Sequence, residues 1–116
     1  MIYQGTTPII IGTVDVEFDY SNVYATIEQN GVIITKSSRQ SNDIEITKNY
    51  DEETGEFVSS TVAMYLSQQE TLKFEAGKAR SQLRWVDILG NAKATDIKAN
   101  IEFAESLYQE VITYGD

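Results

Sequence analysis

The stretch VAMYLSQQETLKFEAGKARSQLRWVDILGN, residues 62–91, contains two strand patterns joined by a short polar segment. In each pattern, apolar residues alternate with polar ones. A period of two places successive side chains on opposite faces of a sheet, so each segment is expected to bury one face. The expected inward residues are Val62, Met64 and Leu66 in the first pattern, and Ala79, Ser81, Leu83 and Trp85 in the second. Trp85 is expected to occupy the centre of the core alone, flanked by Leu83 and Met64.

The joining segment has the spacing of a helix N-terminus. Ser67 is followed three residues later by Glu70, as in a capping box, where each side chain binds a main-chain amide of the other residue. The segment is too short for a long helix, so we predict one helical turn near residues 68–73. Leu72 and Phe74 are expected to close the end of the core, and Gly77 to end the turn.

Similar patterns extend over most of the chain. Asn30-Gly31 lies between two alternating segments, and this pair favours a two-residue hairpin turn because both positions need positive φ. Turn residues recur at intervals typical of a sandwich or barrel. The expected strands are residues 7–18, 23–29, 32–35, 43–50, 57–66, 78–89 and 92–103. We therefore predict an all-β, immunoglobulin-like β-sandwich of about seven antiparallel strands over residues 1–103, followed by a C-terminal tail, residues 104–116.

Composition argues against several functions. The chain of 116 residues contains no cysteine and no histidine, which removes thiolate chemistry, the Ser-His pair and the commonest zinc ligands. Its net charge of −9 disfavours nucleic acid and anionic membranes as partners. No apolar run is long enough to span a membrane, and no secretory signal peptide is expected. We expect a non-enzymatic protein with no cofactor.

Two acidic groups have alternative interpretations. The segment DEETGE, residues 51–56, could hold a cation weakly, but it lacks the spacing of a preorganised calcium loop and suits a solvated turn better. Asp15, Glu17 and Asp19 share one face of the first expected strand. Acid–base work by such carboxylates would need a pocket, and a polar strand face is the simpler interpretation.

Two further features suggest an interface. Lys78, Arg80 and Arg84 form a basic row on one strand, which is either solvated or able to bind carboxylates of a partner. In the tail, Leu107, Tyr108, Val111 and Ile112 add apolar surface after the last expected strand. These tail residues either pack back on their own domain or contact another subunit.

Four short motifs carry a resemblance to a known group of proteins. These are LSQQETLKF at residues 66–74, AGK at 76–78, QLRW at 82–85 and TDIK at 95–98. Together they resemble small proteins encoded among the tail and baseplate genes of phages and prophages of Gram-positive bacteria. They are also similar to the N-terminal domain of the baseplate upper protein. Residues 110–112, EVI, resemble a closing GVI motif, with Glu110 where glycine is usual.

The resemblance implies a β-sandwich that serves as a structural or docking protein of a virion tail or baseplate. It would be made in the bacterial cytoplasm, and its partners would be other tail or baseplate subunits or further copies of itself. An alternative from composition is a module that binds carbohydrate or another surface ligand. The chain has seven tyrosines, whose rings can stack on sugars, and Tyr24 and Tyr65 are the exposed candidates.

Overall fold

The protein is almost entirely β-structure in the computed structural model, which describes residues 1–18, 22–39 and 43–115. The expected all-β class is therefore confirmed. Within the described ranges the strands are β1 (Ile2–Tyr3), β2 (Ile9–Val14), β3 (Val23–Gln29), β4 (Val32–Ser37), β5 (Ile44–Tyr50), β6 (Phe57–Tyr65), β7 (Gly77–Val86), β8 (Ala92–Asp96) and β9 (Ile101–Ala104), and the one helix is α1 (Gln68–Thr71).

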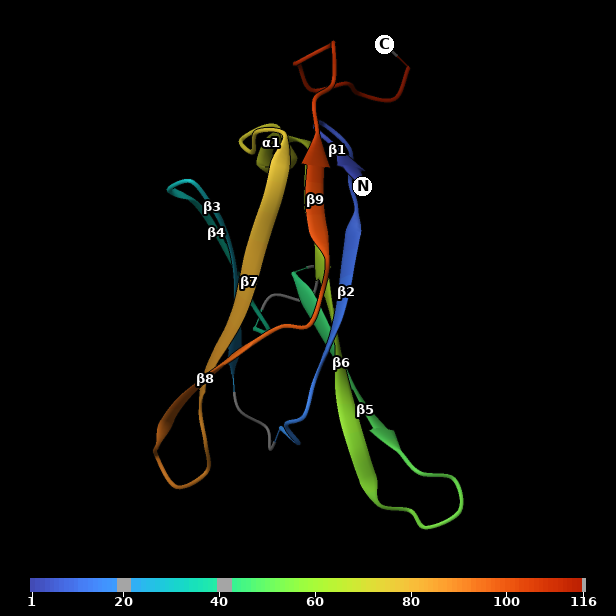
Figure 1. Ribbon diagram of the computed structural model, residues 1–116, viewed down its shortest axis with the longest axis vertical. Coiled ribbons are helices and arrows are strands. Elements are labelled where there is room, and N and C mark those ends of the chain that lie inside the picture. Colours follow the sequence, from blue (N-terminus) through green and yellow to red (C-terminus); the bar gives the residue numbers. More distant parts are fainter. Residues whose placement is uncertain (19–21, 40–42, 116) are drawn as a thin grey trace.

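The strands form two sheets (Figure 1). The larger, six-stranded sheet has the order β1-β9-β7-β3-β4, with β8 also paired to β7. The smaller sheet has the order β2-β6-β5. All pairs are antiparallel except β1 with β9, which is parallel. Buried side chains from both sheets belong to one apolar cluster, so each sheet turns one face toward a common core.

Nine strands lie in the described part of the chain where about seven were expected. One addition is β1, which is only two residues long and too short to produce a periodic pattern. The other arises because residues 92–103 do not form one strand but divide into β8 and β9. In addition, the first long strand is shorter than the expected 7–18, since β2 covers only Ile9–Val14.

A close approach to Gly12 accounts for the division between β8 and β9. The connecting residues leave the larger sheet and reach β2, where the Lys98 amide donates to the Thr13 carbonyl at 3.3 Å. A Cβ atom on Gly12 would lie 2.3 Å from Cγ2 of Ile97, which is far inside van der Waals contact. Only glycine leaves space for Ile97 here, so this position joins the two sheets along one side of the core.

Local signals in the sequence are confirmed at the turns. Asn30 and Gly31 have φ of 49° and 88°, and they join β3 to β4 as a hairpin. Ser67 caps α1, with both hydrogen bonds of the capping box present. Phe74 is buried after α1 and stacks on Phe103 with ring centroids 4.5 Å apart, while Leu72 is only partly buried. The end of the core is thus closed mainly by Phe74.

The inward face of β7 is as expected, with Ser81, Leu83 and Trp85 buried and Ala79 partly buried. The surroundings of Trp85 differ from the expectation of a lone central ring. Its indole meets the Phe18 ring edge to face, with centroids 5.1 Å apart. Phe18 lies beyond the end of β2, so strand periodicity does not reveal its contact with Trp85.

We expect Leu83→Ala to lower the free energy of unfolding by about 2–5 kcal/mol, because the side chain is fully buried and its loss leaves a cavity. Arg80→Ala, on the outward face of the same strand, should change it by less than about 0.5 kcal/mol. Chemical denaturation of both variants measures the difference. Equal effects would show that the inward and outward faces of β7 are wrongly assigned.

Candidate functional site

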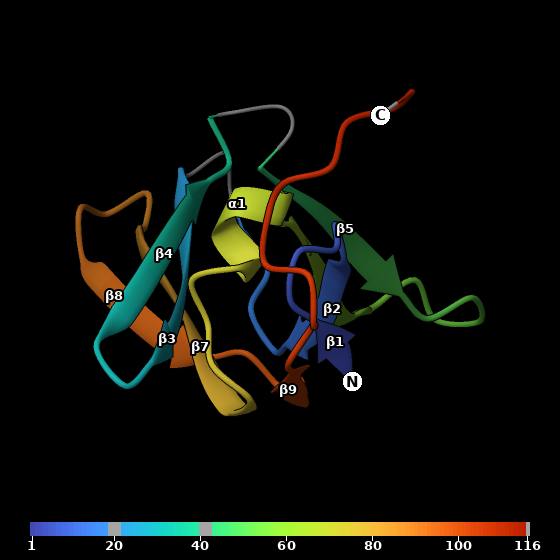
Figure 2. The ribbon, with the colours of Figure 1, turned by 90° about the horizontal axis from the view of Figure 1, so that it is seen from above.

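The tail leaves the end of β9 and crosses over α1 (Figure 2). Its first anchor is Gln4, whose side chain is almost fully buried. The Gln4 amide N–H donates to the Ala104 carbonyl at 3.0 Å, and the Ser106 hydroxyl donates to the Gln4 carbonyl at 2.6 Å. The Gln4 side-chain oxygen accepts from the Ser106 amide at 3.1 Å and from Gln109 Nε2 at 2.8 Å. Its Nε2 donates to the Phe74 carbonyl. Gln4 therefore joins the tail to the segment after α1.

The second anchor is Gln68 at the start of α1. Its Nε2 donates to the Ile112 carbonyl and its Oε1 accepts from the Ile112 amide, both at 2.8 Å. One side-chain amide thus satisfies both main-chain groups of a tail residue, in the way a neighbouring strand would. This contact holds the main chain at Ile112 without burying its side chain.

The apolar side chains of the tail are not buried by its own domain. Leu107 is 100% exposed, Tyr108 64%, Ile112 56% and Val111 43%. Tyr114 is also fully exposed. The polar anchors fix the main chain, and the apolar groups remain in solvent. The tail is therefore an ordered segment that presents apolar side chains outward.

An ion pair positions the helix that carries Gln68. Lys36 Nζ in β4 lies 2.6 Å from Glu70 Oε1, and this carboxylate oxygen also accepts from the Ser67 amide at 2.9 Å. Partial burial raises the pKa of Glu70, but the hydrogen bonds from Lys36 and the Ser67 amide outweigh it and leave the pKa below its usual value. Glu70 thus stays ionised at neutral pH and ties α1 to the larger sheet.

The three basic side chains expected on β7 all point outward, but the residues that face them on the neighbouring strands differ. Lys78 faces Glu102 of β9 in the register, and Arg80 faces Glu28 of β3. Arg84 instead lies between Tyr24 of β3 and Ala94 of β8. Among the residues that the structure describes, none of the three cations forms an ion pair. Arg84 is the member of the row with no carboxylate opposite it.

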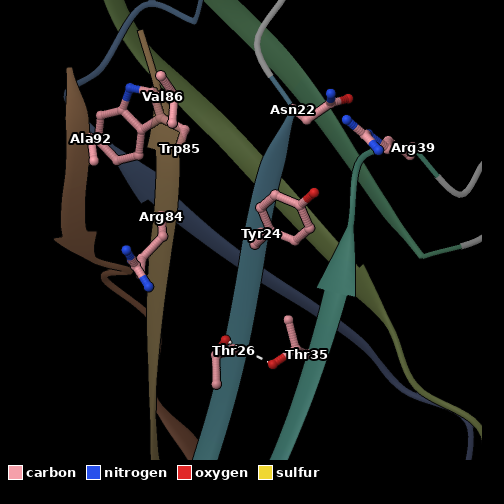
Figure 3. Close-up of a pocket in the computed structure, with 9 residues that line it drawn as sticks. All are labelled: Asn22, Tyr24, Thr26, Thr35, Arg39, Arg84, Trp85, Val86 and Ala92. Atoms are coloured by element: carbon pink, nitrogen blue, oxygen red, sulfur yellow. Dashed lines mark hydrogen bonds between the residues drawn. The ribbon is translucent and has the colours of Figure 1, made fainter. Parts of the chain in front are cut away.

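Arg84 lines a groove of about 670 Å³ on the outer face of the larger sheet (Figure 3). The exposed side chains that line the groove include Tyr24, Arg39, Arg84, Val86 and Ala92, whereas the indole of Trp85 is buried in the core. It combines apolar surface with two guanidinium groups, and no carboxylate is among its lining residues within the described ranges. Sequence reasoning missed Arg39 and the groove itself, because Tyr24, Arg39 and Arg84 meet only through the pairing of β7, β3 and β4.

The acidic candidates are dispersed. Asp51 Oδ1 accepts from the amides of Thr54 and Glu53, which lowers its pKa and marks an ordinary turn. Asp15 and Glu17 lie beyond the end of β2, so they do not form a row on a strand face; Asp15 pairs with Lys98 at 3.6 Å. Asp19 lies outside the described residues. Over residues 1–18, 22–39 and 43–115 no cluster of potential ligands could hold a metal ion.

Comparison with protein-family models, with curated protein sequences and with solved structures finds no match to this chain. In the part of the chain that the structure describes, no helix has the length and apolar character needed to cross a membrane.

Replacing Gln68 tests whether it holds the tail. In Gln68→Ala, we expect the Ile112 amide to exchange with solvent at least about tenfold faster, because its acceptor is removed. Gln69→Ala is the matched control, since Gln69 is exposed on the same helix. Hydrogen exchange followed by NMR measures both. Unchanged exchange at Ile112 in Gln68→Ala would contradict the anchor.

Proposed function

We propose that this chain is a non-enzymatic structural and docking protein of a phage or prophage tail or baseplate, acting through protein–protein contacts. The observation that carries the proposal is the tail. Its main chain is held by Gln4 and Gln68, while Leu107 and its apolar neighbours stand in solvent. A contiguous exposed apolar segment on a small domain is typical of an interaction site. The virion context comes from the resemblance carried by residues 66–98.

The strand order supports the finer fold assignment, an immunoglobulin-like sandwich. In such folds one sheet contains strands B, E and D, and the other contains G, F, C and, in variable-type domains, C′. The order β2-β6-β5 corresponds to the first set, and β9-β7-β3-β4 corresponds to the second. The departures are the absence of the disulfide, because there is no cysteine, and two strands outside these sets, β1 beside β9 and β8 on β7.

The carbohydrate alternative has less support from the geometry. Tyr24 and Tyr65, its two candidates, lie on β3 and β6, which belong to different sheets, and each alternates with buried residues. Their rings therefore point away from the core on different faces and cannot stack on one sugar. The Tyr65 hydroxyl also donates to Glu45, and this hydrogen bond raises its pKa. A protein-docking role accounts for the exposed apolar side chains of the tail, whereas a sugar site formed by these tyrosines does not.

Truncation tests the docking role. Ala104 belongs to β9, so the truncation is best placed directly after it. A chain ending at Ala104 should keep a cooperative unfolding transition, because the core cluster contains no tail residue, and it should lose association measured by light scattering. If the truncated chain were unfolded, the tail would belong to the fold.

A substitution separates loss of contact from loss of structure. Leu107→Ser should also weaken association, whereas Ile11→Thr, which likewise replaces an exposed apolar side chain with a polar hydroxyl-bearing one on β2, should not. The virion context is tested by the position of the coding sequence, which we expect among tail, baseplate or lysis genes. A position far from any such genes would contradict that part of the proposal.

A further inference from the structure

We infer that the groove formed by Tyr24, Arg39, Arg84 and Val86 binds the tail of a second copy of this chain, so that copies join head to tail. The inference rests on the proposed function only in taking the tail to be a docking segment; it adds the identity of the partner and the surface that receives it.

The groove is a local exception to the charge of the molecule. The chain carries 18 acidic and 9 basic residues, yet the groove contains two arginines and no carboxylate among its lining residues in the described ranges. Arg84 has no ion-pair partner within that part of the structure, and its neighbours across the strands are Tyr24 and Ala94. A guanidinium group beside aromatic and aliphatic surface suits a segment that has both a carboxylate and apolar side chains.

The tail has this complementary chemistry. No lysine or arginine occurs after Lys98, and the tail contains Glu105 and Glu110. Glu110 directly precedes Val111 and Ile112, which are both exposed. We therefore assign Glu110 to the arginines of the groove and the adjacent apolar side chains to the exposed Tyr24 and Val86. Opposite charges at an interface fix register and suppress wrong pairings.

A tail that enters the groove must come from another copy, because a chain cannot place its own anchored tail in its own groove. The tail lies over α1, near the start of β7 (Figure 1). The groove is lined by residues 84–86 at the other end of β7 and by Ala92 of β8. Arg84 is seven residues beyond Gly77, a distance of about 23 Å along a strand. The donor and acceptor surfaces are thus different patches at different ends of the molecule. Such heterologous contacts generate rings or filaments rather than closed symmetric pairs, which suits a repeated virion structure.

Charge exchange between two variants tests the inference. Arg84→Glu and Glu110→Arg, each alone, should weaken self-association at least about tenfold by sedimentation, because like charges then meet in the groove. An equimolar mixture of the two should regain the mass of the unaltered protein, since each tail now finds a groove of opposite charge. Arg80→Glu is the matched control: it lies on the same outward face of β7 but outside the groove, and it should associate normally.

Several outcomes would overturn the inference. The inference would be wrong if Arg84→Glu associated as strongly as Arg80→Glu, or if the mixture of Arg84→Glu and Glu110→Arg stayed dissociated. A full-length chain that is monomeric at millimolar concentration would also exclude a second copy as the partner. If the full-length chain did not self-associate but bound another virion protein, and removal of the tail abolished that binding, the docking role would stand. Only the second copy as partner would then be wrong. Binding of an oligosaccharide that Arg84→Glu abolishes would assign the groove to a sugar instead.

Thermal unfolding of each variant confirms that the fold is retained, and Arg39→Glu provides a second test of the same groove from a different segment.

Discussion

The arrangement of the molecule depends on one strand, β7, which must serve two partners along the same edge. Its first residues pair with β9, its later residues pair with β8, and β3 runs along its other edge. The chain between β8 and β9 therefore has to leave the sheet, and it does so where Gly12 leaves room for Ile97. The same strand buries Leu83 and Trp85 on one face and carries Arg84 on the other. The single strand β7 thus contributes to the core, to the pairing of the larger sheet and to the groove.

The tail depends on a different kind of constraint. Its order comes from two glutamine side chains, Gln4 and Gln68, which bond to its main chain and leave its apolar groups uncovered. Apolar burial normally fixes a segment, but here the polar contacts do so. A segment fixed in this way loses little further conformational freedom on binding, so more of its contact energy remains available for affinity.

Much of the local structure could be predicted from the sequence. The alternation around Val62 and Leu83, the Asn30-Gly31 hairpin and the Ser67 capping box depend on residues close together in the chain. Pairings between distant segments could not be predicted in the same way. The break between β8 and β9, the parallel pairing of β1 and the contact of Phe18 with Trp85 all depend on the three-dimensional arrangement.

The same distinction between local signals and long-range pairing applies to the candidate site. Arg84 and the tail residues stand out by their chemistry alone, whereas the groove exists only because the register sets Tyr24 opposite Arg84 and brings Arg39 to the same face. Lys78 and Arg80 belong to the same sequence pattern as Arg84, but each faces a glutamate on a neighbouring strand. The sequence therefore indicates which residues could bind a partner, and the strand pairing decides which of them share a surface.

Disulfide trapping tests tail-to-groove docking most directly, because the chain contains no cysteine of its own. Chains carrying Val111→Cys would be mixed with chains carrying Ala92→Cys, which lines the groove, or Thr47→Cys on β5 as a control. Docking of the tail in the groove should give a mixed disulfide between Val111→Cys and Ala92→Cys chains, in clear excess over either same-variant disulfide and over the Thr47→Cys pairing. Equal yields from the groove and control positions would contradict it.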